Sequence, residues 1–170
     1  AVVIFGQVLL VFLVLLYIIL KTNKKNKQIE FLIDFISQNA LSLAFFVSVS
    51  ATVGSLFLSE VAKITPCMLC WYQRIFMFPQ VVILGIALVK NDQGVKKYII
   101  ALSLIGSLIA IYHFFLQRIP TLPLPCTNDV VSCTQKQIEL FGYLTIPLMS
   151  LTAFLLIILI LLVGYKNNKK

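Results

Sequence analysis

Charged side chains are scarce in this chain of 170 residues: they make up 12% of it, whereas ordinary soluble domains carry roughly 25%. Apolar residues reach 60% of the chain. A single domain of this length could not hide so much apolar surface from water. The composition therefore excludes a water-soluble protein and indicates that lipid surrounds most of the chain.

Acidic residues are few, six against fourteen basic residues, and the net charge is +8. Such a charge would suit a nucleic-acid-binding protein if the basic residues shared one face. Instead, ten of them form three short clusters beside apolar runs, a pattern typical of membrane orientation signals, so no nucleic acid partner is expected. The clusters are Lys21, Lys24, Lys25 and Lys27; Lys90, Lys96 and Lys97; and Lys166, Lys169 and Lys170.

Five apolar runs approach or reach the roughly 20 residues that cross a bilayer as a helix. They are continuous rather than alternating, so helices satisfy their backbone hydrogen bonds in lipid. The predicted fold class is all-α: an integral membrane four-helix bundle in residues 31–170, with an additional N-terminal transmembrane helix and a basic cytoplasmic tail in residues 1–30. The runs cover residues 1–20, 40–58, 70–89, 98–117 and 143–165.

The run at residues 1–20 could instead be a signal peptide, but its basic flank follows the run rather than preceding it. We therefore expect a true helix with its N-terminus outside. If all five runs span, the three basic clusters fall on one side, which is then the cytoplasm. The other side holds residues 59–69 and 118–142, and these contain or border all four cysteines.

Small residues predict which helices lie inside the bundle, because they let membrane helices approach closely. The run at 143–165 is mostly Leu, Ile, Val and Phe, which favours a lipid-facing position. Two other runs carry small residues at helical spacing and are expected inside. These residues are Ala44, Ser48, Ser50, Thr52, Gly54 and Ser55 in run 40–58, and Ser103, Gly106, Ser107 and Ala110 in run 98–117.

The four cysteines form two pairs on the predicted outer side. Cys67 and Cys70 form a Cys-x-x-Cys motif, and Cys126 and Cys133 lie in the longer outer loop. An oxidising compartment favours disulfides in both pairs. A bridge across two residues removes little entropy from the unfolded chain, so it stabilises poorly, but it suits redox chemistry because the partner thiol is always close.

The residues around the Cys-x-x-Cys motif predict a reactive thiolate. Thr65 and Pro66 are typical of an N-cap and a first helical position, which would place Cys67 in the first turn, near the positive end of the helix dipole. Arg74 lies one turn after Cys70 on the same face. It could hold the Cys70 thiolate or donate to the carbonyl of an electron acceptor. The alternative is an interfacial arginine that reaches the lipid headgroups.

His113, which is the only histidine, shares a face with Gln117 near the outer end of run 98–117. A lone histidine on a helix is more often structural than catalytic. Both residues, however, should lie at about the depth of Arg74. A quinone head needs two or three polar groups facing an apolar slot, so Arg74, His113 and Gln117 predict a quinone-binding site.

The segment Cys67-Met-Leu-Cys70-Trp-Tyr-Gln-Arg74 resembles the disulfide bond formation protein B (DsbB) family, including its BdbC-type branch. Further similarities are His113 with Gln117, the outer-loop cysteine pair, and Phe141-Gly-Tyr-Leu-Thr-Ile-Pro147 at the last run. The resemblance covers roughly residues 39–165. The run at residues 1–20 has no counterpart in the usual four-helix pattern of the family.

The resemblance implies an enzyme of the bacterial cytoplasmic (inner) membrane that drives disulfide bond formation, with its cysteine loops on the periplasmic or extracellular side. It implies that Cys126 forms a mixed disulfide with a thioredoxin-fold, DsbA-like partner and that Cys133 relays to Cys67. Cys70 would then face the quinone (ubiquinone or menaquinone), with Arg74 supporting it and His113 and Gln117 nearby. No metal is expected.

Three other interpretations are open at this point. A non-enzymatic membrane protein with two structural disulfides explains where the cysteines lie, but not Arg74 or the short Cys-x-x-Cys loop. A zinc site needs all four cysteines reduced and converging, which an oxidising compartment opposes. A relative of vitamin K epoxide reductase would carry the loop pair before the Cys-x-x-Cys motif, the reverse of the order here.

Overall fold

The computed structural model describes residues 34–119, 133–134 and 145–167. A short 3₁₀ helix, η1 (Gln93–Val95), precedes the third of four long α-helices in this part of the chain. The all-α prediction is confirmed, and the helices match four of the predicted runs to within three residues at either end. The run at residues 1–20, with the predicted division after residue 30, lies outside the described residues. The long helices are α3 (Ala40–Glu60), α4 (Met68–Lys90), α5 (Lys96–Arg118) and α6 (Ile146–Asn167).

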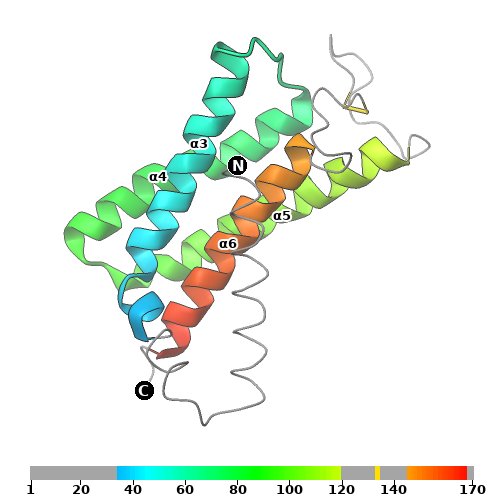
Figure 1. Cartoon of the computed structure of the whole chain (residues 1–170). Helices are drawn as coiled ribbons and strands as arrows, with labels where there is room; N and C mark the ends of the chain where they lie inside the picture. Colours follow the sequence, from blue (N-terminus) through cyan, green and yellow to red (C-terminus); the bar gives the residue numbers. More distant parts are fainter. Residues whose placement is uncertain (1–33, 120–132, 135–144, 168–170) are drawn as a thin grey trace.

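These four helices form a closed ring in which α3 packs on α4, α4 on α5, α5 on α6, and α6 on α3 (Figure 1). Consecutive helices run in opposite directions, so the start of α4 and the end of α5 lie at the same end of the bundle. Each helix is long and apolar enough to cross a membrane. The Cys-x-x-Cys motif at the start of α4 is therefore at the opposite end from the α4–α5 connection, which carries one of the basic clusters.

Small residues bring α5 close to α6, and the predicted interior position of run 98–117 is confirmed. Ser103, Gly106, Ser107 and Ala110 are all buried along α5. The ring of Phe154 on α6 lies directly against Gly106, and a Cβ built on Gly106 would overlap that ring. Phe154 is itself fully buried, so the ring has little room to move aside. The close approach of α5 and α6 therefore requires a glycine at position 106.

The predicted division into inner and lipid-facing helices is wrong for α3 and α6. In the most apolar stretch of α6, which is expected to face lipid, 56% of the residues are buried, compared with 17% in α3, which is expected inside. Ala44 and Ser48 of α3 are buried, but Ser50 and Gly54 are exposed. Lipid chains are as apolar as Leu and Ile, so an apolar composition does not distinguish the bundle interior from the lipid.

Two buried polar side chains connect the helices away from the cysteine motif. Gln80 of α4 donates to the Phe76 carbonyl at 2.9 Å and accepts from the Ser103 hydroxyl of α5 at 3.1 Å. Lys96 of α5 donates to the Gly164 carbonyl of α6 at 3.3 Å. Polar groups in lipid are costly unless they are paired in this way.

Candidate dithiol active site

Helix α4 begins immediately after the first cysteine of the motif. Cys67 is the N-cap, with an extended backbone (φ −73°, ψ 171°), and its carbonyl accepts the first helical hydrogen bond from Trp71 N–H at 3.1 Å. The predicted N-cap at Thr65 and helical Pro66 are therefore wrong by two residues. Cys67 is 5% exposed and packs in a buried cluster with Leu69. These tertiary contacts, rather than the local preference of Thr-Pro, set the start of the helix.

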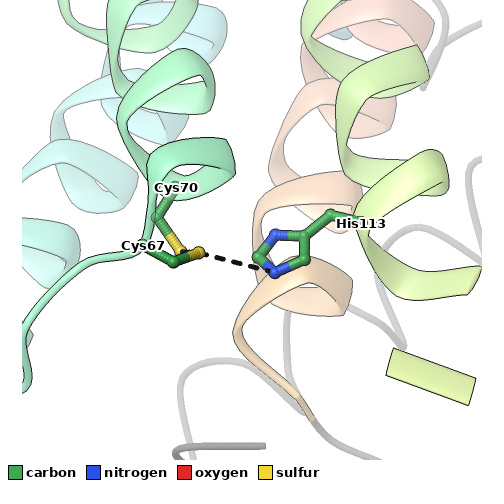
Figure 2. A group of neighbouring side chains, drawn as sticks. All are labelled: Cys67, Cys70 and His113. Carbon is green, nitrogen blue, oxygen red and sulfur yellow. Dashed lines mark hydrogen bonds between the residues drawn. The ribbon is translucent and has the colours of Figure 1, made fainter. Parts of the chain in front are cut away.

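The sulfurs of Cys67 and Cys70 lie 3.1 Å apart, and both residues are free thiols (Figure 2). Cys67 is buried and Cys70 is partly exposed in the first turn of α4. The extended backbone at the N-cap directs the Cys67 side chain back toward Cys70. The pair is therefore close enough to close a disulfide by side-chain movement alone.

His113 of α5 reaches this pair from across the bundle. Its Nε2 lies 3.7 Å from the Cys67 sulfur (Figure 2), and the residue is 1% exposed. On the other side of the ring, Nδ1 lies 3.1 Å from the side-chain nitrogen of Gln73. Gln73 in turn accepts a hydrogen bond from Ser150 of α6 at 2.5 Å. The first thiol is thus the end of a chain of contacts that joins α4, α5 and α6.

Neither Gln73 nor Ser150 is predicted as a site residue from the sequence. A signal for Gln73 exists, because it lies on the buried stripe of α4, between Leu69 and Met77 at four-residue spacing. A glutamine on such a stripe needs a polar partner. Ser150 carries no comparable signal, because serine is common in membrane helices and often bonds its own backbone.

The surroundings of Cys67 favour its thiolate. A hydrogen bond from the Cys70 thiol, followed by the interaction with His113 and a bond from the Cys70 backbone, lowers the pKa of Cys67 to about 4 even though burial opposes ionisation. The N-cap position adds the positive end of the helix dipole. Cys67 is therefore a thiolate at neutral pH when the pair is reduced. The prediction that the helix start stabilises a thiolate at Cys67 agrees with this.

Arg74 lies one turn beyond Cys70, but its hydrogen bonds in the described residues go to α3. Its Nε donates to the Ser55 hydroxyl at 3.0 Å and its Nη2 to the Ser55 carbonyl at 2.9 Å. The guanidinium also stacks over the ring of Trp71, 5.3 Å from its centroid. Trp71 and Tyr72 are 54% and 40% exposed, on the outer surface of the bundle. Arg74 thus links α4 to α3 at the edge of the dithiol site rather than binding either sulfur.

The remaining predicted site residues lie at the same end of the bundle. Gln117 is partly buried on α5, one turn beyond His113. Cys133 is disulfide-bonded and 1% exposed, and it belongs to the same buried cluster as Cys67. Cys126 lies outside the described residues. The structure therefore brings Cys67, Cys70, His113 and Cys133 together.

A four-cysteine zinc site does not fit this arrangement, because Cys133 is already in a disulfide. Among the described residues, Cys67, Cys70 and His113 form one group of three possible metal-binding side chains, with donor atoms within 4.8 Å of one another. Two thiolates on a tetrahedral zinc ion lie about 3.8 Å apart, whereas these sulfurs are 3.1 Å apart. That separation favours one shared proton or a disulfide, so we assign the group to thiol chemistry.

Four membrane-length helices that hold a thiol pair at a helix start, against a buried histidine and a nearby disulfide, define a membrane thiol–disulfide protein. The family model described as "Disulfide bond formation protein DsbB" matches residues 37–164. The chain belongs to this family, and it is a multi-pass membrane protein with a role in disulfide formation. The predicted resemblance is confirmed.

Individual relatives agree with this assignment. The chain is 44% identical over 132 residues to "Disulfide bond formation protein C" of Bacillus subtilis (strain 168), covering 75% of this chain and 95% of that protein. It is 42% identical over 135 residues to "Probable disulfide formation protein" of Chlamydia pneumoniae, covering 79% of this chain and 98% of that protein. No solved structure matches the chain.

Proposed function

We propose that this protein reoxidises an extracytoplasmic thioredoxin-fold, DsbA-like dithiol protein and passes the electrons to a membrane quinone. The observation that carries the proposal is the reduced Cys67–Cys70 pair, 3.1 Å apart, in one buried cluster with the disulfide-bonded Cys133. Two structural disulfides, the alternative function, give no reason for a buried histidine 3.7 Å from the Cys67 sulfur.

Electrons enter through two thiol–disulfide exchanges. A thiolate of the partner attacks Cys126 of a Cys126–Cys133 disulfide, and a sulfur–sulfur bond to the partner forms as Cys133 leaves as a thiolate. Cys133 then attacks Cys67 of a Cys67–Cys70 disulfide, and Cys70 leaves. When the partner and the loop pair have each closed their own disulfides, two electrons reside on the Cys67 thiolate and the Cys70 thiol, which hold one proton between them, and the other proton is released to the aqueous phase.

The chain's residues near Cys70 fit a flat acceptor with carbonyl groups. In the described residues Arg74 uses its Nε and Nη2 on Ser55, which leaves N–H groups on Nη1 for a carbonyl oxygen. Trp71 offers an exposed aromatic face beside it, and the Thr145 hydroxyl at the same bundle end is buried with no hydrogen-bond partner in the described part of the chain. A bound quinone, ubiquinone or menaquinone, would accept the two electrons of the pair, with one proton from the Cys70 thiol and one from the aqueous phase.

The direction of the bundle in the membrane follows from the basic clusters. The α4–α5 connection, with Lys90 and Lys97, lies at the end opposite Cys67. Positively charged loops remain on the cytoplasmic side. We therefore place the thiol pair on the periplasmic or extracellular side of the bacterial cytoplasmic membrane, where a DsbA-like partner can reach it.

The proposal is tested with the full chain in proteoliposomes that contain or lack ubiquinone-10 or menaquinone-7. We expect oxidation of a reduced thioredoxin-fold oxidase only with a quinone present, with one quinol formed for each disulfide made. Protein thiols are followed by alkylation and quinol by ultraviolet absorbance. Oxidation at the same rate without quinone, or without quinol formation, would contradict the proposal.

The two possible roles of Arg74 can be separated by a pair of variants. If Arg74 acts on the acceptor, Arg74→Ala lowers the quinone-dependent rate by about 100-fold, the usual effect of removing one well-placed donor to a developing negative charge. Ser55→Ala removes the hydroxyl that holds Arg74 but keeps the guanidinium, so we expect a change of about threefold or less. Equal losses in the two variants would show that Arg74 serves only to hold α4 against α3.

A further inference from the structure

Three hydrogen-bond contacts in series connect α6 to the first thiol of the motif. The Ser150 hydroxyl contacts the Gln73 oxygen, the Gln73 nitrogen contacts His113 Nδ1, and His113 Nε2 contacts the Cys67 sulfur. Gln73 and His113 are 5% and 1% exposed, so bulk water cannot replace these bonds. The order of donors and acceptors along the series therefore determines which nitrogen of the histidine carries the proton.

The orientation of the Gln73 amide follows from the distances. Its contact with Ser150 is 2.5 Å, which lies at the short limit of O–H···O bonds and below the range of N–H···O bonds. The Ser150 hydroxyl, which also lies 2.9 Å from the Pro147 carbonyl, must therefore face the amide oxygen. The amide nitrogen then faces His113 Nδ1 at 3.1 Å, and because that nitrogen is only a donor, Nδ1 must accept. The ring proton is left on Nε2, directed at Cys67.

We infer that Gln73 is a positioning residue, which fixes the tautomer and orientation of His113 so that its Nε2–H donates to the Cys67 sulfur and stabilises the thiolate. Gln73 acts through the histidine and touches neither sulfur. In this hydrogen bond the proton stays on Nε2 and no electron is transferred. The thiol–disulfide exchanges of the proposed function are therefore unchanged. This inference deepens the proposed function, but its test needs neither a partner protein nor a quinone.

Among the described residues, few other groups could set the acidity of Cys67. From α4 the titratable group in contact with it is Cys70, whereas Arg74, one turn deeper, acts on Cys70 rather than on Cys67. From α5 the titratable groups are His113 and Tyr112, which packs against the same buried cluster. The residues of α3 and α6 that join these hydrogen-bond contacts are Ser55, which bonds Arg74, and Ser150, which bonds Gln73. Both side chains are neutral. Of these groups, His113 is the one whose donor nitrogen depends on Gln73.

The test is the pH dependence of alkylation of Cys67 in the reduced full-length protein. Iodoacetamide reacts with the thiolate, and the tryptic peptide from Ile64 to Arg74 carries both cysteines of the motif, which fragmentation mass spectrometry separates. For the unmodified chain we expect a midpoint near pH 4. For Gln73→Leu we expect the midpoint to rise by at least one pH unit, which slows alkylation on the acid side about tenfold.

Three further variants distinguish positioning from packing. Gln80→Leu is the matched control: Gln80 is equally buried on the same stripe of α4 and bonds Ser103, away from the sulfurs, so the midpoint should not move. Gln73→Glu should keep a low midpoint, because a carboxylate accepts from a protonated Nδ1 while Nε2 keeps its proton. Ser150→Ala removes the hydroxyl that holds the Gln73 amide in one orientation, so the midpoint of alkylation should rise, but less than in Gln73→Leu. This variant also serves as the test if Gln73→Leu fails to fold.

The outcomes are decisive in both directions. Rises for Gln73→Leu and Ser150→Ala, with Gln80→Leu unchanged and Gln73→Glu low, support the inference. An unchanged midpoint in folded Gln73→Leu or Ser150→Ala, or an equal rise in Gln80→Leu, overturns it. Because no acceptor is present, overturning it would leave the proposed quinone chemistry untouched, and failure of quinone reduction would leave this result intact.

Discussion

A Cys70→Ser variant oxidises a dithiol partner at least about 1,000-fold more slowly than the unmodified protein, in the range seen when a nucleophile is removed from an enzyme. Serine fills nearly the same volume beside the Cys67 sulfur, which lies 3.1 Å away in the native pair. The bundle should therefore fold normally. A hydroxyl cannot form a disulfide. The variant therefore lacks the Cys67–Cys70 disulfide that accepts two electrons in the proposed reaction.

The measurement is the rate of partner oxidation in membranes supplied with quinone, alongside the amount of each variant inserted. Met68→Leu is the control, because Met68 lies between the two cysteines but is 39% exposed and contacts neither sulfur in the described hydrogen bonds. We expect it to work at the normal rate. Normal quinone-dependent oxidation by Cys70→Ser would end the proposal that the motif is the redox centre.

A Gly106→Val variant loses about 3 kcal/mol of bundle stability, at the upper end of the cost of overpacking a close-packed interior. Its Cβ would overlap the Phe154 ring, which is fully buried and cannot turn away without displacing α6. The loss corresponds to more than 100-fold in the folding equilibrium. In this case α5 would also carry His113 away from Cys67, so activity should fall with stability.

Thermal unfolding in detergent, followed by circular dichroism, measures this loss. Gly54→Val on α3 provides the control, because in the described part of the chain no atom from another helix lies within 4 Å of a Cβ built at that position. It makes the same change of residue in a membrane helix and should shift the midpoint of unfolding little. Similar shifts in both variants would show that valine weakens these helices for a reason other than the Phe154 contact.

The helices can be predicted from the sequence because the thickness of the bilayer sets their length. The run at 70–89 becomes α4 (Met68–Lys90), and the run at 98–117 becomes α5 (Lys96–Arg118). Their rotation about their own axes cannot be predicted in the same way. Outward and inward faces of a membrane helix are equally apolar, and for this reason α6 is buried where its composition favours a lipid-facing position.

The residues of the site can be predicted more easily than the contacts between their side chains. His113 is correctly placed near the cysteine motif, and the structure adds a contact with the Cys67 sulfur that the sequence does not indicate, while its place beside the quinone stays a prediction. Arg74 is correctly placed one turn beyond Cys70, but its side chain bonds Ser55. Each of these pairings joins residues on different helices, and their meeting depends on how closely the helices pack. Gln73 can be recognised only once the buried face of α4 is known.

The change from exposed Trp71 and Tyr72 to buried Gln73 within three successive residues has a consequence for kinetics. The thiol pair lies where one surface faces hydrocarbon and another faces the loop end of the bundle. In the proposed reaction, a lipid-soluble quinone would diffuse to it in two dimensions along the side of α4, while a water-soluble partner protein would dock from the aqueous phase. The two reactants therefore approach from different phases and do not share a binding surface. Raising the concentration of either one should not competitively inhibit the reaction of the other.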